Sequence, residues 1–228
     1  MSELAHSGTT YDVVESEPPE ILARNLSSAG ILLAGATAFF FVSFVFAYFY
    51  LRALDNANLW RPKGVNPSTA YGTVITALIV ISAVLVRLGL SDHRAERRPA
   101  WRLKGLVALV CGLAALVVQC VAWATLGFGP SSGGYASVYV GWTAFTFLFV
   151  FGTLYWLETI LATSYRYRGW ATGAATVGPG EAAGDPHRAG ADIRDPVSLV
   201  RAELGALSFY WMFLAGICVL AWIVLYLL

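Results

Sequence analysis

Long uncharged stretches dominate the pattern of hydrophobic and polar residues along this chain. Residues 25–51, 64–86, 105–157 and 204–228 contain no Asp, Glu, Lys or Arg. A helix needs about 20 mainly apolar residues to cross a membrane, and the third stretch would form a helix of about 80 Å, too long for one crossing. Because Gly-Phe-Gly-Pro-Ser-Ser-Gly-Gly at 127–134 breaks that stretch, we predict five membrane-spanning helices. We place them at 29–51, 68–88, 106–126, 137–162 and 207–228.

The composition favours an all-α polytopic membrane protein and excludes several other classes. Of the 228 residues, 57% are hydrophobic and 13% are charged, whereas soluble domains carry roughly 25% charged residues. A formal net charge of +1 without a long basic run argues against a nucleic-acid partner. Three cysteines are too few for a disulfide framework. The first 24 residues hold five acidic side chains and no short apolar core, so we expect no cleaved signal peptide.

The distribution of Lys and Arg predicts the orientation. With five spans, the N-terminal segment, the second loop and the fourth loop share one side, which carries 12 of the 15 basic residues. Because basic loops stay on the cytoplasmic side, we expect a cytoplasmic N-terminus and a C-terminus outside. We interpret residues 1–28 as a cytoplasmic arm and the Gly- and Ala-rich residues 169–194 as a flexible loop. Asp195 before Pro196 is typical of a helix start, so the last helix is expected to begin there.

Few side chains in the predicted spans can support chemistry. The three histidines, His6, His93 and His187, all fall in the tail or the predicted loops, so no span offers a common haem or copper ligand. The cysteines of the third span, Cys111 and Cys120, lie about 180° apart around a helix and cannot pair. No arrangement of nucleophile, base and oxyanion donors is visible. We therefore predict no catalytic residue, cofactor site or metal site in this chain.

Two strongly polar groups lie within the predicted spans, where polar groups are the first candidates for function. Gln119, in the middle of the third span, is either an interhelical hydrogen-bonding group or a contact in a ligand or proton path. Glu158, near the inner end of the fourth span, reaches interfacial water or a basic loop residue, or else collects protons or contacts a lipid headgroup. Arg52 and Asp55, at the outer end of the first span, are expected to pair.

Motifs in four spans and one loop carry a family resemblance. The first span holds Phe40-Phe41, then Ala47-Tyr48 and Arg52, and Trp60 begins the loop that runs to Pro67. The third span has Gly112 and Gln119 to Trp123, the fourth has Thr143 to Val150, and the fifth has Tyr210 to Phe213 with Tyr226. In this order, over about residues 30–228 except the 169–194 loop, the motifs resemble subunit III of the haem-copper oxidases, the cytochrome c oxidase group. The five spans agree with the shorter bacterial form of that subunit.

The resemblance implies an accessory subunit in a bacterial-type plasma membrane, without haem or copper of its own. Haem and copper would belong to the partner catalytic subunit, which this chain would pack on and stabilise, and whose proton uptake it would support. Other oxidase subunits and membrane lipids would be its neighbours, and it could bind phospholipid. The positions expected to make helix, proton or lipid contacts are Phe40, Phe41, Tyr48, Gln119, Trp123, Glu158, Trp211 and Tyr226.

The chain departs from the family pattern where the family has buried charged and imidazole groups. In the family these groups are linked to lipid binding and to internal hydrogen bonds. The family's Glu, His and Asp positions are occupied here by Thr37, Ala122, Thr146, Phe149, Met212 and Ala215. The aromatic positions are kept, and aromatic side chains bury large areas. The resemblance therefore still implies the family's packing role for these residues.

Other interpretations stay open. The accessory subunit of a nitric oxide reductase belongs to the same superfamily, and the sequence does not separate it from the oxidase subunit. A small transporter would need a polar path through the bundle, and the chain shows no internal repeat of the kind common in transporters. A membrane scaffold without chemistry of its own is the remaining alternative.

Overall fold

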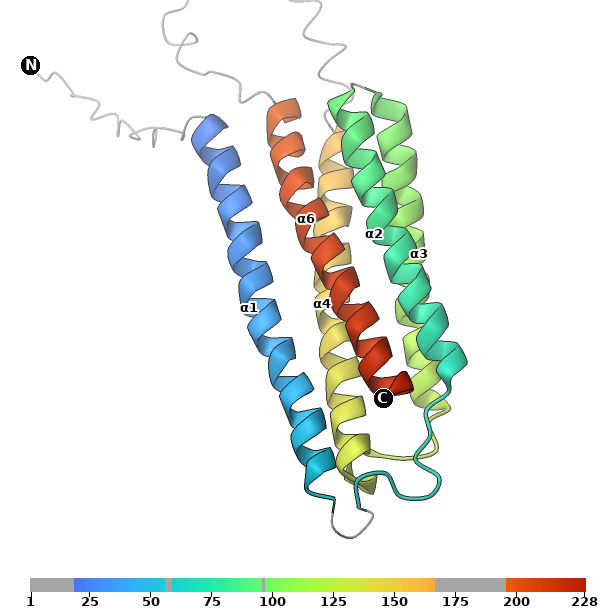
Figure 1. Ribbon diagram of the computed structural model, residues 1–228. Coiled ribbons are helices and arrows are strands. Elements are labelled where there is room, and N and C mark those ends of the chain that lie inside the picture. Colours follow the sequence, from blue (N-terminus) through green and yellow to red (C-terminus); the bar gives the residue numbers. More distant parts are fainter. Residues whose placement is uncertain (1–18, 56–58, 96, 167–195) are drawn as a thin grey trace, which may run out of the picture.

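Five long helices make up the bundle seen in the computed structural model, which describes residues 19–55, 59–95, 97–166 and 196–228 (Figure 1). All five are long and apolar enough to cross a membrane, as predicted. The expected arm up to residue 18 and the expected loop at 169–194 lie outside the described residues. The helices are α1 (Pro19–Ala53), α2 (Thr69–Arg94), α3 (Arg98–Ala124), α4 (Gly134–Arg166) and α6 (Pro196–Trp222), with the 3-10 helix η1 (Pro130–Ser132) before α4 and the π-helical turn η3 (Ile223–Leu227) after α6.

The helices extend beyond the predicted spans. α1 begins at Pro19 rather than at residue 29, α2 continues to Arg94 rather than ending at 88, and α6 begins at Pro196, where the Asp-Pro pair predicted a start. Hydropathy marks the part of a helix that suits the membrane, whereas Arg, Lys, Ala and Leu all favour a helix in water. The uncharged stretches therefore located the spans but not the helix ends.

These extensions lie together at one end of the bundle. There α1, α3 and α6 begin and α2 and α4 end, while the α1–α2 connection, the α3–α4 connection and residue 228 lie toward the opposite end (Figure 1). We call the first end the basic end, because the predicted cytoplasmic loops with most of the Lys and Arg start and finish there. That the basic end faces the cytoplasm stays a prediction.

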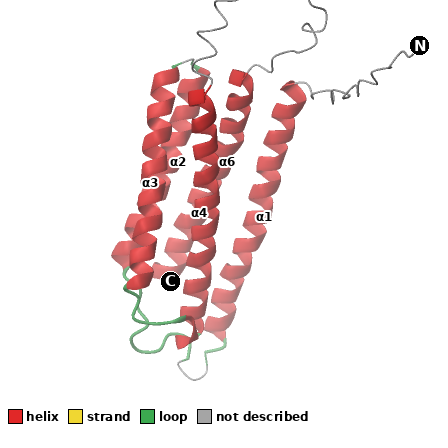
Figure 2. Cartoon of the chain, turned by 180° about the vertical axis from the view of Figure 1, so that it is seen from behind, coloured by secondary structure: helices red, strands yellow, loops and turns green. Residues whose placement is uncertain are grey.

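Helix α6 holds the bundle together. It packs against α1, α2 and α4, and α2 packs along α3 as an antiparallel hairpin. In both views α1 and α3 lie at opposite edges of the bundle (Figures 1 and 2). Helix α3 approaches α4 closely through small residues, since a Cβ atom on Gly112 would lie 2.3 Å from Leu154 Cδ2. Glycines at a helix crossing let two backbones approach in a membrane.

The two connections at the end opposite the basic end are bonded to each other. The backbone N–H of Gly134 donates to Leu59 O at 3.2 Å, and that of Tyr135 donates to Trp60 O at 2.9 Å. Gly133 has a φ of +147° and lies against Pro62, so a side chain there would be strained and would clash. These contacts fix the start of α4 against the loop that follows α1.

The expected pair between Arg52 and Asp55 is wrong. Arg52 Nη1 donates to the backbone oxygen of Leu228 at 2.8 Å. Asp55 Oδ1 accepts from the backbone N–H groups of Leu59 at 2.9 Å and Trp60 at 3.2 Å. Both side chains satisfy backbone groups that helix ends and turns leave without partners. The two contacts tie the end of α1 to Leu228, which follows η3, and to the loop after α1.

Candidate functional site

The aromatic pair Phe40 and Phe41 joins α1 to α4. Phe41 is fully buried, and its ring centroid lies 5.5 Å from that of Phe149 and 6.3 Å from that of Trp142. Phe40 is half-buried and lies 4.8 Å from Phe145 in an edge-to-face arrangement. Such ring pairs stabilise a contact beyond the area they bury. Both residues therefore make helix contacts within this chain.

Tyr48 and Tyr226 lie toward the end opposite the basic end. Tyr48 is buried, with its ring 5.0 Å from that of Trp60 in a T-shaped arrangement. The hydroxyl groups of Tyr226 and Tyr139 share a hydrogen bond of 3.1 Å between α4 and η3. The Tyr226 ring also lies so close to Gly72 that a Cβ atom there would be 2.4 Å from Tyr226 Cζ. Tyr226 thus packs between α2 and α4.

Trp211 connects three helices through one hydroxyl group. Its Nε1–H donates to Ser82 Oγ at 3.1 Å, and Ser82 Oγ donates to the backbone oxygen of Ala108 at 2.7 Å. Trp211 is 1% exposed and Ser82 is 0% exposed. The chain of bonds links α6 to α2 and α3 inside the bundle, where each polar group needs a partner.

Trp123 makes a similar but more peripheral link between α3 and α4. Its Nε1–H donates to Thr143 Oγ1 at 3.1 Å, and the Thr143 hydroxyl donates to the backbone oxygen of Tyr139 at 2.8 Å. The Trp123 ring lies 5.3 Å from that of Phe147. Trp123 is half-buried, so one part of it contacts α4 and the rest faces outward.

Gln119 lines a small, partly open cavity between α2, α3, α4, α6 and η3. It is 8% exposed and sits near the Ala124 end of α3, not at the middle of the helix as expected. Its Nε2 has no hydrogen-bond partner in the described part of the chain, so the expected interhelical bond is wrong for this amide nitrogen. The cavity has a volume of about 40 Å³. Its wall includes Gly72, Thr76, Gln119, Trp142, Thr146 and Tyr226.

A larger hollow of about 250 Å³ lies next to this cavity, toward the end opposite the basic end. Asn66 and Ser68, which precede α2, line it together with Tyr71, Thr125 and Tyr139. Tyr139 lines the larger hollow and Tyr226 lines the cavity. The hydrogen bond between their hydroxyl groups therefore joins the walls of the two spaces.

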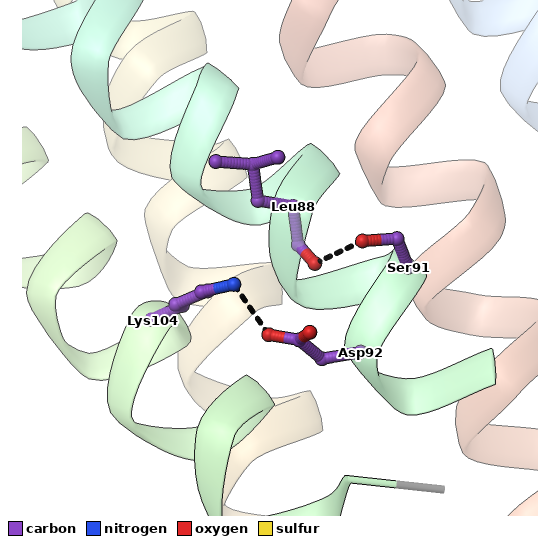
Figure 3. Close-up of polar contacts among 4 residues, drawn as sticks. All are labelled: Leu88, Ser91, Asp92 and Lys104. Atoms are coloured by element: carbon purple, nitrogen blue, oxygen red, sulfur yellow. Dashed lines mark hydrogen bonds and ion pairs between the residues drawn. The ribbon is translucent and has the colours of Figure 1, made fainter. Parts of the chain in front are cut away.

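The basic end of the α2–α3 hairpin carries an ion pair. Figure 3 shows the pair between Lys104 and Asp92. Lys104 Nζ lies 2.5 Å from Asp92 Oδ2, and the Asp92 side chain is 12% exposed. His93 is also buried, and its ring lies 5.4 Å from that of Trp101. The expectation of a loop position for His93 is wrong, because α2 continues through it to Arg94. Trp101, in the first turn of α3, is buried within the bundle.

Glu158 is exposed on the outer face of α4. Tyr155 is exposed beside it, one turn away along the same helix. No described residue forms an ion pair with Glu158, and the side chain of Arg166 lies outside the described residues. A carboxylate on the outer face of a spanning helix needs interfacial water, a lipid headgroup or a partner protein.

The cysteines agree with the sequence analysis, but that analysis did not identify several residues that make contacts between helices. Cys111, Cys120 and Cys218 are all free thiols. Within the described ranges, no three His, Cys, Asp or Glu side chains come together to hold a metal ion. Sequence reasoning missed Ser82, Trp142 and Tyr139. Ser, Thr and aromatic residues are so common in these spans that only their neighbours on other helices distinguish them.

Comparisons with known proteins give no assignment. No family model matches the chain, and a search of curated proteins finds no matching relative. Function is therefore inferred from the motifs and from the geometry of the bundle.

Proposed function

We propose that this chain is an accessory, non-catalytic subunit of a haem-copper respiratory oxidase, resembling subunit III. The observation that supports it is the placement of the motif residues. Four aromatic residues from the motifs of the first, third and fifth spans make contacts that join the helices. They are Phe41 against Trp142, Trp123 to Thr143, Trp211 to Ser82, and Tyr226 to Tyr139. Residues that define the resemblance thus define the packing of this bundle.

The positions where the family has charged groups also support the proposal. Thr37, at the place of a family Glu, is buried and shares a hydrogen bond of 3.1 Å with Tyr210 OH. Phe149, at the place of a family His, packs on Phe41. Ala215, at the place of a family Asp, is buried, whereas Met212, at the place of a family His, is 42% exposed. When a buried network loses one charged group, the remaining charged groups are left without partners and destabilise the fold. In this chain, neutral side chains stand at all of these positions.

In this proposal the chain carries no step of oxygen reduction. Haem and copper are held by the catalytic subunit, in a bacterial-type plasma membrane. The role of this chain is to pack its outer faces against that subunit and against lipid. On α1 such a face repeats at heptad-like spacing, with Leu32, Phe39, Val42 and Phe46 all strongly exposed. Regular apolar side chains of this kind suit the packing of a neighbouring helix.

Glu158 is the charged position whose change is expected to affect the partner. If Glu158 delivers protons to the catalytic subunit, Glu158→Gln slows oxygen consumption by the assembled complex. The effect grows at alkaline pH, where protons are scarce and their collection limits turnover. The measurement is oxygen uptake by purified complex across a pH series, with Tyr155→Phe as the control on the same face. Equal rates for Glu158→Gln and the unchanged protein at every pH would remove this role.

Co-purification with a haem-containing catalytic subunit is the direct test of the proposed function. It distinguishes the oxidase from the reductase, because the two carry different catalytic chains.

A further inference from the structure

Several side chains in the wall of the cavity beside Gln119 carry buried polar atoms without a hydrogen-bond partner in the described part of the chain. Three of the side chains in its wall each have one buried polar atom without a partner in the described part of the chain. These atoms are Gln119 Nε2, Trp142 Nε1 and Thr146 Oγ1. Gln119 is 8% exposed and Trp142 is fully buried. A buried donor or acceptor without a partner is unfavourable, so three around one space point to a small polar ligand that would bond to them.

The size of the cavity limits what that ligand can be. A water molecule needs roughly 10–15 Å³ of such space, so a cavity of about 40 Å³ has room for two or three water molecules. A lipid headgroup or a metabolite is far larger. Empty cavities in proteins are lined by apolar groups, whereas polar ones of sufficient size hold water. Beside its apolar residues, the wall of this cavity includes three threonines, a glutamine, two tryptophans and a tyrosine.

The chemistry of the three atoms also fits water. The Gln119 amide and the Trp142 indole can only donate hydrogen bonds from these nitrogens, whereas the Thr146 hydroxyl can donate or accept. A water oxygen accepts two hydrogen bonds and its hydrogens donate two. A small cluster of water molecules can therefore accept from both N–H groups and bond to the hydroxyl. Most buried water molecules make about three hydrogen bonds of this kind.

We propose that this cavity is a binding site for two or three ordered water molecules inside the membrane-spanning bundle, and that water enters it past the Tyr139–Tyr226 pair. Tyr139 lines the larger hollow together with Asn66 and Ser68, and Tyr226 lines the cavity. The hydroxyl groups of the two tyrosines bond to each other at 3.1 Å, which is why we place the entrance at this pair. The water site does not depend on the proposed oxidase function.

The chain offers a direct probe, because Gln119 is its only glutamine. Cell-free synthesis with glutamine labelled by 15N in the side chain gives one amide signal, which needs no further assignment. The protein in lipid nanodiscs is examined for magnetisation transfer from water to this amide. We expect clear transfer in the unchanged protein. Thr146→Val, which keeps the shape of the side chain, should remove most of the transfer signal because the water cluster loses one partner.

Thr153→Val is the matched control. Thr153 lies on α4 like Thr146, but its hydroxyl donates to the backbone oxygen of Phe149 at 2.7 Å and it does not line the cavity. Its replacement should leave the transfer signal unchanged. A resolved Gln119 amide without transfer from water would show a dry cavity and overturn the proposal. Transfer that persists in Thr146→Val would place the water elsewhere and would also overturn it.

The entrance is tested by Tyr226→Phe, which removes the hydroxyl bond to Tyr139 but keeps the ring on Gly72. After transfer into deuterated water, the Gln119 amide should exchange its hydrogens faster in Tyr226→Phe than in the unchanged protein. Ser82→Ala removes another interhelical bond, between residues that line neither space, and should leave the rate unchanged. Equal rates for Tyr226→Phe and the unchanged protein would overturn the entrance past this pair.

Discussion

Replacement of Trp211 by alanine is expected to destabilise the bundle by about 3–5 kcal/mol, the cost typical of removing a buried tryptophan. Trp211 is 1% exposed, and it lies on the helix that packs against α1, α2 and α4. The substitution removes a large ring and leaves Ser82 with one partner fewer. Unfolding in mixed micelles with increasing SDS, followed by tryptophan fluorescence or circular dichroism, measures the loss.

A control on the same helix separates burial from aromatic content. Phe209 is 48% exposed, so Phe209→Ala removes a ring from the outer face of α6 and should change the stability little. Trp211→Phe and Ser82→Ala each break the hydrogen bond with less loss of volume. Interhelical hydrogen bonds in membranes average about 0.6 kcal/mol, so both should have smaller effects than Trp211→Ala. If Trp211→Ala unfolds no more easily than Phe209→Ala, this description of the core is wrong.

Replacement of Gly112 by valine is expected to weaken the α3–α4 contact by about 1–3 kcal/mol, the usual effect of overpacking. Already the Cβ atom would lie 2.3 Å from Leu154 Cδ2 and 3.1 Å from Leu154 Cγ. Leu154 is 2% exposed and has no free direction in which to move. The helices must therefore separate or Leu154 must leave its rotamer. The same SDS titration measures the effect.

Two further variants identify the cause. Gly152, on α4, has no atom within 4 Å of the place where a Cβ would lie, so Gly152→Val should cost far less than Gly112→Val. Leu154→Ala in the Gly112→Val background makes room for the new side chain and should recover part of the stability, because neighbouring substitutions are not additive. Equal losses for Gly112→Val and Gly152→Val would contradict a close helix crossing at Gly112.

Much of the fold could be predicted from the sequence, because membrane helices leave long uncharged stretches. The break at 127–134 and the start of the last helix at Pro196 were also readable, since Gly and Pro restrict the backbone in known ways. The extensions at the basic end were not, because charged residues end a hydrophobic run without ending a helix. For that reason Asp92, His93 and Lys104 looked like loop residues, although Asp92 and Lys104 join two helices.

The site was only partly predictable. The aromatic motif positions could be named in advance because side chains of that size must be buried somewhere. The residues that share a cavity wall with Gln119 could not, since Trp142 and Thr146 come to that wall only when α3 and α4 pack. The wrong pairing of Arg52 with Asp55 has a similar origin. Opposite charges three residues apart can interact on a helix. Here, however, each of the two side chains forms hydrogen bonds with backbone groups that lie close to it in the fold.

The most direct test of the proposed function is purification of this chain from its native membrane in a mild detergent. A reduced-minus-oxidised visible spectrum and mass identification of the accompanying chains are then recorded. We predict haem bands and a large haem-copper oxidase catalytic subunit in the same preparation. A preparation without haem, with this chain alone or with unrelated partners under conditions that preserve oxidase complexes, would contradict the proposal. Recovery with a nitric oxide reductase catalytic chain would contradict the oxidase assignment as well.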